Sequence, residues 1–326
     1  MLKRNKPFGC ENRLPNVASY RVARSVPAAS SALLAKSRRM FLGVFFIAAL
    51  VGTNAHAQGK PAGVIEKIED AKGHFGVARI SRAGMDERRA VSGEYVYAGD
   101  TIRVPGADAT VTISRKIGPL VICPKGARQE ECSANIDGRE SLLDTAKAFT
   151  ASAHKLVSWY GTANTVNLNT RSGNAPQIKI GAKVTQRIVA GERSLWVPWV
   201  NGDLPATVRL SQSGRLLAEA RIENARQIEF KGLKLVAGPM AVEVTDAQNR
   251  KTSLTLDVVA SAPPAPNFAD SAPTKALERY FAASWLATQG DGAWLFEAAQ
   301  QLTPLAAELQ PAQLLRLAIA DGEKVK

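Results

Sequence analysis

The fold of this protein is decided by residues 91–104, VSGEYVYAGDTIRV, together with residues 109–115, ATVTISR. In residues 109–115 apolar and polar side chains alternate, which is the pattern of a strand with one buried face. In the first segment the pair Gly99-Asp100 marks a turn, because glycine permits a turn conformation and an aspartate carboxylate can cap it. Similar short segments occupy residues 77–82 and 120–123. These patterns predict a small, mostly antiparallel β domain over residues 58–139.

The same residues resemble the FecR-type domain, a family of bacterial envelope proteins. In the family, a glycine and a hydrophobic residue precede a Gly-Asp pair and an apolar position, and an alternating strand follows. In this chain the pair is Gly99-Asp100, and the alternating strand is at residues 109–113. It covers about residues 62–122 and implies an envelope sensor or scaffold domain rather than a catalyst. Gly99 and Asp100 would form the turn of the family motif. The chain departs from the family at residues 115–119, RKIGP, where an acidic-Gly-Ser turn is usual.

Cys123 and Cys132 are the two cysteines that follow residue 57, and they lie nine positions apart. An even pair at this spacing in an exported chain predicts a disulfide. A redox pair or half of a metal site are the alternatives. Neither has a C-x-x-C spacing, and only His74 and His154 follow residue 57, so zinc ligands are scarce.

The rest of the chain alternates between helical and strand periodicity, and the overall fold class is mainly β. About seven short strands over residues 177–260 predict a β-sandwich that is similar to the immunoglobulin-like domains of envelope proteins, although without an intersheet cysteine pair. We further predict a linking helix over 140–160, a linker over 161–176, a Pro-rich linker over 261–274 and a helical tail over 275–326. The tail either packs on the sandwich or covers a partner.

Residues 1–57 are predicted to be a leader whose signal peptide has its apolar core at residues 40–52, MFLGVFFIAALVG. Basic residues precede this core and an A-x-A site follows it, so we expect cleavage between Ala57 and Gln58. The alternative is a single-pass inner-membrane anchor, but the core is shorter than the roughly 20 residues needed to span a bilayer. Residues 37–42, SRRMFL, are similar to the twin-arginine export motif, so both export routes stay open.

The net charge of the chain is +13, but most of this charge lies in the predicted leader. The leader holds nine basic residues and one acidic residue, which leaves only +5 on the remaining 269 residues. The basic spots that remain lack interleaved aromatic residues, so we expect no nucleic-acid partner.

A search for catalytic patterns finds one candidate, the S-x-x-K motif at Ser152 and Lys155. This motif carries the nucleophile of penicillin-recognising enzymes, and residues 172–174 and 251–253 are similar to their two other motifs. Three-residue motifs arise often by chance, and the serine would lie late in the predicted helix. We therefore expect no enzyme, no catalytic residues, no cofactor and no metal site, with a serine acyl-transfer enzyme as the remote alternative.

The sequence as a whole predicts an exported, non-enzymatic envelope protein of the periplasm. Its expected role is that of a protein–protein interaction scaffold or sensor component, whose partner is another envelope or membrane protein. The alternative is a module that binds peptidoglycan or polysaccharide, because Trp196 and Trp199 could form a sugar-stacking platform. Since these residues lie three apart, a strand would direct them to opposite faces, and at least one should be core.

Overall fold

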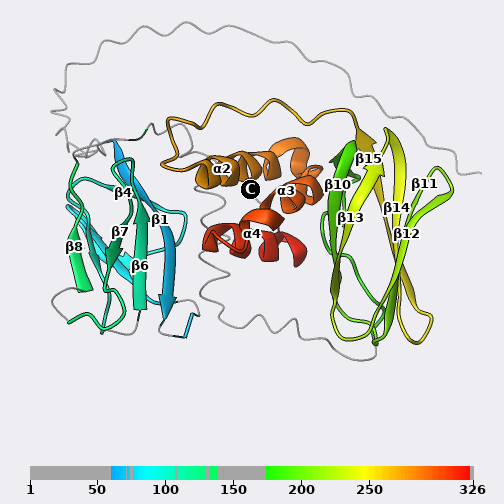
Figure 1. Cartoon of the computed structure of the whole chain (residues 1–326), viewed down its shortest axis with the longest axis horizontal. Helices are drawn as coiled ribbons and strands as arrows, with labels where there is room; N and C mark the ends of the chain where they lie inside the picture. Colours follow the sequence, from blue (N-terminus) through cyan, green and yellow to red (C-terminus); the bar gives the residue numbers. More distant parts are fainter. Residues whose placement is uncertain are drawn as a thin grey trace, which may run out of the picture. The chain divides into compact units, whose positions relative to one another are not determined.

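The computed structural model describes residues 60–70, 72–73, 76–106, 109–128, 132–138, 142 and 174–323. Outside these ranges lie the leader with its cleavage site at Ala57 and Gln58, all but Leu142 of the predicted linking helix, and most of the linker that follows it. The described residues form a mainly β structure with helices near the C-terminus, as predicted (Figure 1).

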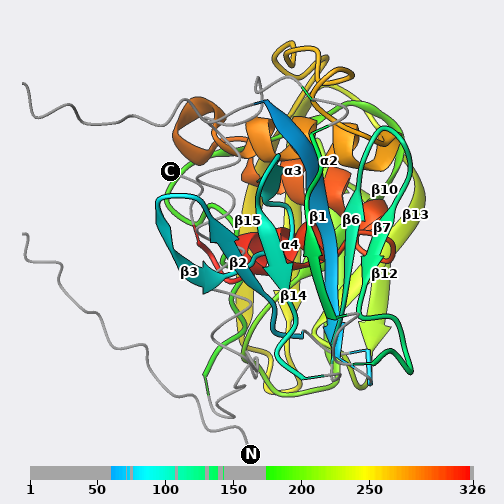
Figure 2. The same cartoon turned by 90° about the vertical axis from the view of Figure 1, so that its left-hand side faces the viewer.

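The N-terminal β domain consists of two four-stranded antiparallel sheets. The first has the order β4-β1-β6-β7, with β1 (Pro61–Asp70), β4 (Tyr95–Tyr97), β6 (Ala109–Ser114) and β7 (Leu120–Ile122). Figure 2 shows β6 between β1 and β7. The second has the order β3-β2-β5-β8, with β2 (Arg79–Arg82), β3 (Met85–Arg89), β5 (Thr101–Arg103) and β8 (Ser133–Asn135).

The core of this domain is made by the inward positions of the alternating strands. Ile102 of β5 and Val111 and Ile113 of β6 are fully buried, as their spacing predicts. Ile65 of β1 joins the same cluster, together with Cys123 and Cys132. The apolar face of the decisive segments is therefore the face that holds the two sheets together.

The second β domain contains seven strands, the number that the sequence indicates. They are β9 (Gln186–Val189), β10 (Gly191–Pro198), β11 (Ala206–Gln212), β12 (Arg215–Ile222), β13 (Gln227–Leu235), β14 (Gly238–Thr245) and β15 (Lys251–Val259). One sheet has the order β12-β11-β14-β15-β9, and the other contains β10 and β13. The β15–β9 pair is parallel, whereas the other pairs are antiparallel.

The predicted helical tail consists of α2 (Lys275–Ala287), α3 (Leu295–Leu302) and α4 (Gln310–Ala320), joined by the short 3₁₀ helices η3 (Gln289–Gly292) and η4 (Thr303–Leu305). Helix α2 begins at a threonine cap, since the Thr274 hydroxyl accepts a hydrogen bond from the backbone N–H of Leu277 at 3.3 Å. The helix ends at Ala287.

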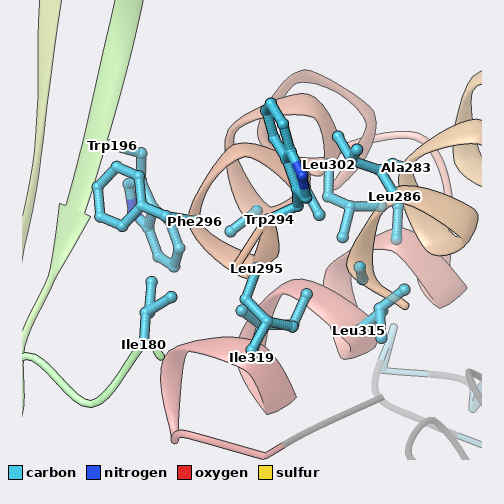
Figure 3. Packing of buried hydrophobic residues seen from close by; sticks show 14 of the residues in the cluster. Ile180, Trp196, Ala283, Leu286, Trp294, Leu295, Phe296, Leu302, Leu315 and Ile319 are labelled. Atoms are coloured by element: carbon cyan, nitrogen blue, oxygen red, sulfur yellow. The ribbon is translucent and has the colours of Figure 1, made fainter. Parts of the chain in front are cut away.

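The tail packs on the chain's own strands rather than standing free. Phe296 of α3 lies beside Trp196 of β10, while Leu295 of α3 faces Ile319 of α4 (Figure 3). Tyr95 of β4 also contacts α2, with its ring centroid 5.7 Å from that of Phe281. The question left open by the sequence is thereby answered: the tail docks on the sandwich, and it also contacts the N-terminal domain.

Buried glutamines, which we call glutamine clamps, bind strand backbones in the manner of a neighbouring strand. Gln300 of α3 accepts a hydrogen bond from the backbone N–H of Trp196 at 2.7 Å and donates one to the Trp196 carbonyl at 2.9 Å. Gln310 of α4 makes the same pair with Ile68 of β1, at 2.9 and 2.8 Å. A primary amide carries the donor and acceptor of a peptide group, so each clamp binds the N–H and the carbonyl of one strand residue.

Candidate functional site

The predicted turn at Gly99 and Asp100 is a structural element held by a buried ion pair. Gly99 has a φ of +84°, a conformation that favours glycine. The Asp100 carboxylate is fully buried and accepts a hydrogen bond from the backbone N–H of Tyr97 at 2.8 Å. Arg82 donates two hydrogen bonds to the same carboxylate, at 2.6 and 2.7 Å, and these bonds raise the pKa of Arg82. Both oxygens of Asp100 are thus engaged by the fold itself.

The two cysteines predicted to pair do form a disulfide, Cys123–Cys132. The bridge closes the segment between β7 and β8, which belong to different sheets. Both cysteines are buried in the core of the N-terminal domain. The disulfide is therefore a structural bond, and such bonds are typical of oxidising compartments.

Replacing both Cys123 and Cys132 by alanine is expected to lower the free energy of unfolding by roughly 2.5–3 kcal/mol, because the bridge restricts the unfolded chain. Urea denaturation of the two proteins measures this difference. Wild-type protein in dithiothreitol should show the same loss as the double variant, whereas the double variant should not respond to dithiothreitol. If dithiothreitol did not change the urea midpoint of the wild type, the prediction would be contradicted.

The S-x-x-K motif at Ser152 and Lys155 lies outside the described residues. Of the two motifs that would accompany it, Lys251 is the first residue of β15 and forms an exposed ion pair with Glu243 at 3.3 Å. Within the described part of the chain there is no cluster of histidine, cysteine, aspartate and glutamate that could hold a metal ion.

Trp196 and Trp199 are both buried, with only 4% and 2% of their surface exposed. The expectation that they face opposite sides of a strand is wrong, because β10 ends at Pro198 and both tryptophans line one cavity of about 380 Å³. Neither ring offers an exposed platform for stacking a sugar chain. The two residues instead form an aromatic wall inside the protein.

Three segments form the wall of this cavity, which we call the tryptophan cavity. The first comprises the end of β10 and the residues after it, and the second is the segment 225–227 before and at the start of β13. The third is one face of α4, whose lining residues Gln313, Arg316, Leu317 and Ala320 follow the i, i+3, i+4, i+7 spacing of a helix face. The cavity therefore lies between the sandwich and the last helix of the tail.

The polar groups of the cavity wall are rich in hydrogen-bond donors. The Arg316 guanidinium lies over the Trp196 ring, 4.5 Å from its centroid. The indole N–H of Trp196 donates a hydrogen bond to the side-chain carbonyl oxygen of Gln227 at 3.0 Å, so this oxygen is already engaged. Arg226 donates to the carbonyls of Asn201 and Gly202 at 3.2 and 3.1 Å. As far as the chain is described, the wall thus carries two guanidinium groups and no carboxylate.

Arg316 differs from the other partly buried arginines that the structure describes. Arg193 is paired with Glu297 at 2.8 Å, and Arg250 with Asp246 at 2.6 Å. Arg316 has no ion pair or hydrogen bond with another described residue; its Nε atom is buried without a partner, as are the Nε atoms of Arg115 and Arg193. Burial lowers the pKa of Arg316, while the charge of Glu229 acts in the opposite direction.

Sequence reasoning found the tryptophans but missed Arg316, Gln313 and Gln227 as partners in the same site. The available signal was Arg316 itself, which is the one charged residue of α4. The spacing of Gln313 and Arg316 places them on one helix face. That this face meets Trp196 depends on how the tail folds back, which local patterns do not encode.

A second kind of candidate surface is the open edge of the five-stranded sheet. Strand β12 pairs with β11 alone within the described residues. Leu216 on this strand has 54% of its surface exposed. The other large apolar residues that are exposed in the described part are Val77, Met85, Ile117, Val121 and Val236. Among the helices described, none combines the length and the apolar character needed to cross a membrane.

Comparison with known proteins places the chain in no family: no family model matches it, and no curated protein is similar in sequence. Among solved structures, CopC from Methylosinus trichosporium OB3b is similar with 14% identity and a TM-score of 0.19, over 24% of this chain and 86% of that one. The ZIG-8–RIG-5 immunoglobulin heterodimer shows 16% identity and a TM-score of 0.19, over 26% and 88%. The fibronectin(III)-like modules of Clostridium thermocellum CbhA show 10% identity and a TM-score of 0.19, over 60% and 86%. The mainly β fold assignment therefore rests on the strand pairing of the chain itself.

Proposed function

We propose that this chain is an exported, non-enzymatic envelope protein that acts in the periplasm as a protein–protein interaction scaffold or sensor component. The FecR-type pattern around Gly99 and Asp100 supports the envelope setting, and the Cys123–Cys132 disulfide is compatible with it. The partner is another envelope or membrane protein. The observation that carries the proposal is the open edge of β12.

Strand β12 offers what an extended partner segment needs in order to add a strand to a sheet. It is eight residues long, and one of its edges is unpaired within the described structure. An unpaired edge presents a row of backbone donors and acceptors that a second chain can satisfy. The exposed Leu216 supplies an apolar contact beside this row. The tail, by contrast, buries its apolar faces on the chain's own strands.

A photoreactive amino acid at position 216 is expected to give a discrete cross-linked species in cells, whereas the same group at position 117 should not. Ile117 is a matched control, since it is also an exposed apolar residue but lies in the turn after β6. We further expect that Leu216→Lys removes the partner without changing the unfolding temperature, because a lysine blunts an open strand edge and the side chain is exposed. Equal cross-linking at both positions, or none at 216, would count against docking on β12.

The burial of Trp196 and Trp199 removes the exposed platform on which the peptidoglycan alternative was based. Retention on peptidoglycan sacculi should therefore be weak and the same for the wild type and the Leu216→Lys variant. Pull-down with sacculi, using the wild type and the Leu216→Lys variant, separates this alternative from protein docking.

A further inference from the structure

The tryptophan cavity has the size and the wall of a small-molecule site. Its volume of about 380 Å³ lies in the range of ligand pockets, roughly 300–1,000 Å³. Apolar surface from Trp196, Trp199 and Leu317 is combined with a few polar groups that converge from three separate segments. Such a combination of an apolar body and few polar groups is typical of pockets that bind and orient one compound.

The charge of the wall indicates the sign of the compound. Arg226 and Arg316 both line the cavity, and no acidic residue of the described part of the chain does. Gln227 uses its carbonyl oxygen on Trp196, which leaves its amide nitrogen as the group available to a ligand. The cavity therefore offers mainly donors and positive charge, and an anionic group would be complementary to both.

The absence of an ion-pair partner for Arg316 among the described residues also favours an anionic ligand. Burying a charge without a partner is costly, and the partly buried guanidinium of Arg193 is paired with the Glu297 carboxylate, while that of Arg226 is bound by two backbone carbonyls. Among the described residues, Arg316 lies over the face of Trp196, 4.5 Å from the ring centroid, and feels the charge of Glu229, but its Nε atom is buried without an acceptor. A guanidinium held against an aromatic ring keeps its edge N–H groups for a planar anion.

We propose that the tryptophan cavity binds a small organic carboxylate with an apolar or ring-shaped body, and that Arg316 is the residue that binds its charge. The body would lie against the tryptophan wall, and the carboxylate would accept hydrogen bonds from the Arg316 guanidinium. A neutral sugar fits this wall less well, since it lacks the anion that the donors require. The site is separate from the β12 edge, so the two proposals can fail independently.

Matched pairs of carboxylates and carboxamides test the proposal directly. The probes are cyclohexanecarboxylate and its amide, phenylacetate and its amide, and N-acetylmuramic acid beside the neutral N-acetylglucosamine. Isothermal titration and tryptophan fluorescence of the full chain measure binding. We expect the carboxylate of at least one pair to bind at least about tenfold more tightly than its neutral counterpart, because a charged hydrogen bond is lost in the latter. The probe pair that shows this preference distinguishes a cell-wall sugar acid from an aromatic or alicyclic acid as the ligand.

Two variants and one control make the test specific to this site. Arg316→Met keeps an unbranched apolar stem and should weaken carboxylate binding by about tenfold or more, while the unfolding temperature stays equal or rises because an unpaired charge is removed. Ala320→Phe should abolish binding by filling the cavity from the same face of α4. Arg279→Met removes an exposed charge of α2 and should leave binding unchanged.

Three results would overturn the proposal. The first is that no probe carboxylate binds the wild type at millimolar concentration. The second is that carboxylates and their neutral counterparts bind equally. The third is that a carboxylate binds the Arg316→Met and Ala320→Phe proteins as well as the wild type, which would place its site elsewhere.

Discussion

Asp100→Ala is expected to lower the free energy of unfolding by about 3–5 kcal/mol, the range for breaking a buried ion pair from one side. The Asp100 carboxylate is fully buried and holds Arg82 through two hydrogen bonds at 2.6 and 2.7 Å. Its loss leaves the Arg82 charge unpaired and removes the acceptor for the backbone N–H of Tyr97. The turn between β4 and β5 thereby loses the group that fixes it.

The matched control is Glu219→Ala. Glu219 pairs with Arg209 at 2.6 Å, the same distance as the Arg82–Asp100 contact, but both side chains are exposed. An exposed pair contributes about 0–1 kcal/mol, so the control should barely shift the urea midpoint. Equal shifts for the two variants would show that the buried pair does not hold the N-terminal domain.

Gln300→Met is expected to lower the free energy of unfolding by roughly 2–5 kcal/mol, because two buried backbone groups lose their partners at once. Methionine keeps the length of the side chain and its fit in the apolar interface, so the change isolates the amide. The N–H and the carbonyl of Trp196, now bound at 2.7 and 2.9 Å, would be left unsatisfied between β10 and α3.

Gln301→Ala is the control for this change, one position further along the same helix. Gln301 makes one side-chain hydrogen bond, to Glu297 at 3.1 Å, and it is only partly buried. Thermal and urea unfolding should show a loss of about 1 kcal/mol or less. If Gln300→Met unfolds no more easily than Gln301→Ala, the glutamine clamp does not hold the tail on the sandwich.

The strands that could be predicted from sequence are those that bury one clean face. Residues 109–115 alternate strictly, and β6 follows that pattern from Ala109 to Ser114. Strand β1 was not predicted, because its polar residues Glu66 and Lys67 interrupt the alternation and a register shift lies at this point. Strand β3, MDERR, has no apolar pattern, since most of it is exposed at the edge of its sheet.

Whether a candidate site could be predicted likewise depends on how far apart its residues lie in the sequence. The turn at Gly99 and Asp100 and the disulfide depend on residues close together in sequence, and both could be read from spacing. The tryptophan cavity brings Trp196 together with Arg316, far along the chain. Glutamines such as Gln300 and Gln310 also read as surface residues by composition, since glutamine is mostly exposed in proteins. Only the docking of the tail turns them into buried partners of a strand.

The glutamine clamps have a consequence for how the protein is made. The amide of Gln310 that binds Ile68 lies 242 residues downstream of it, and the one that binds Trp196 lies 104 residues downstream. During synthesis the backbone groups of Ile68 and Trp196 therefore emerge long before the helices that bind them. Strand β10 lies at the edge of its two-stranded sheet, so until α3 has left the ribosome this edge remains a template for pairing with another nascent chain. Synthesis of α3 is thus the event that covers the edge of β10 at Trp196.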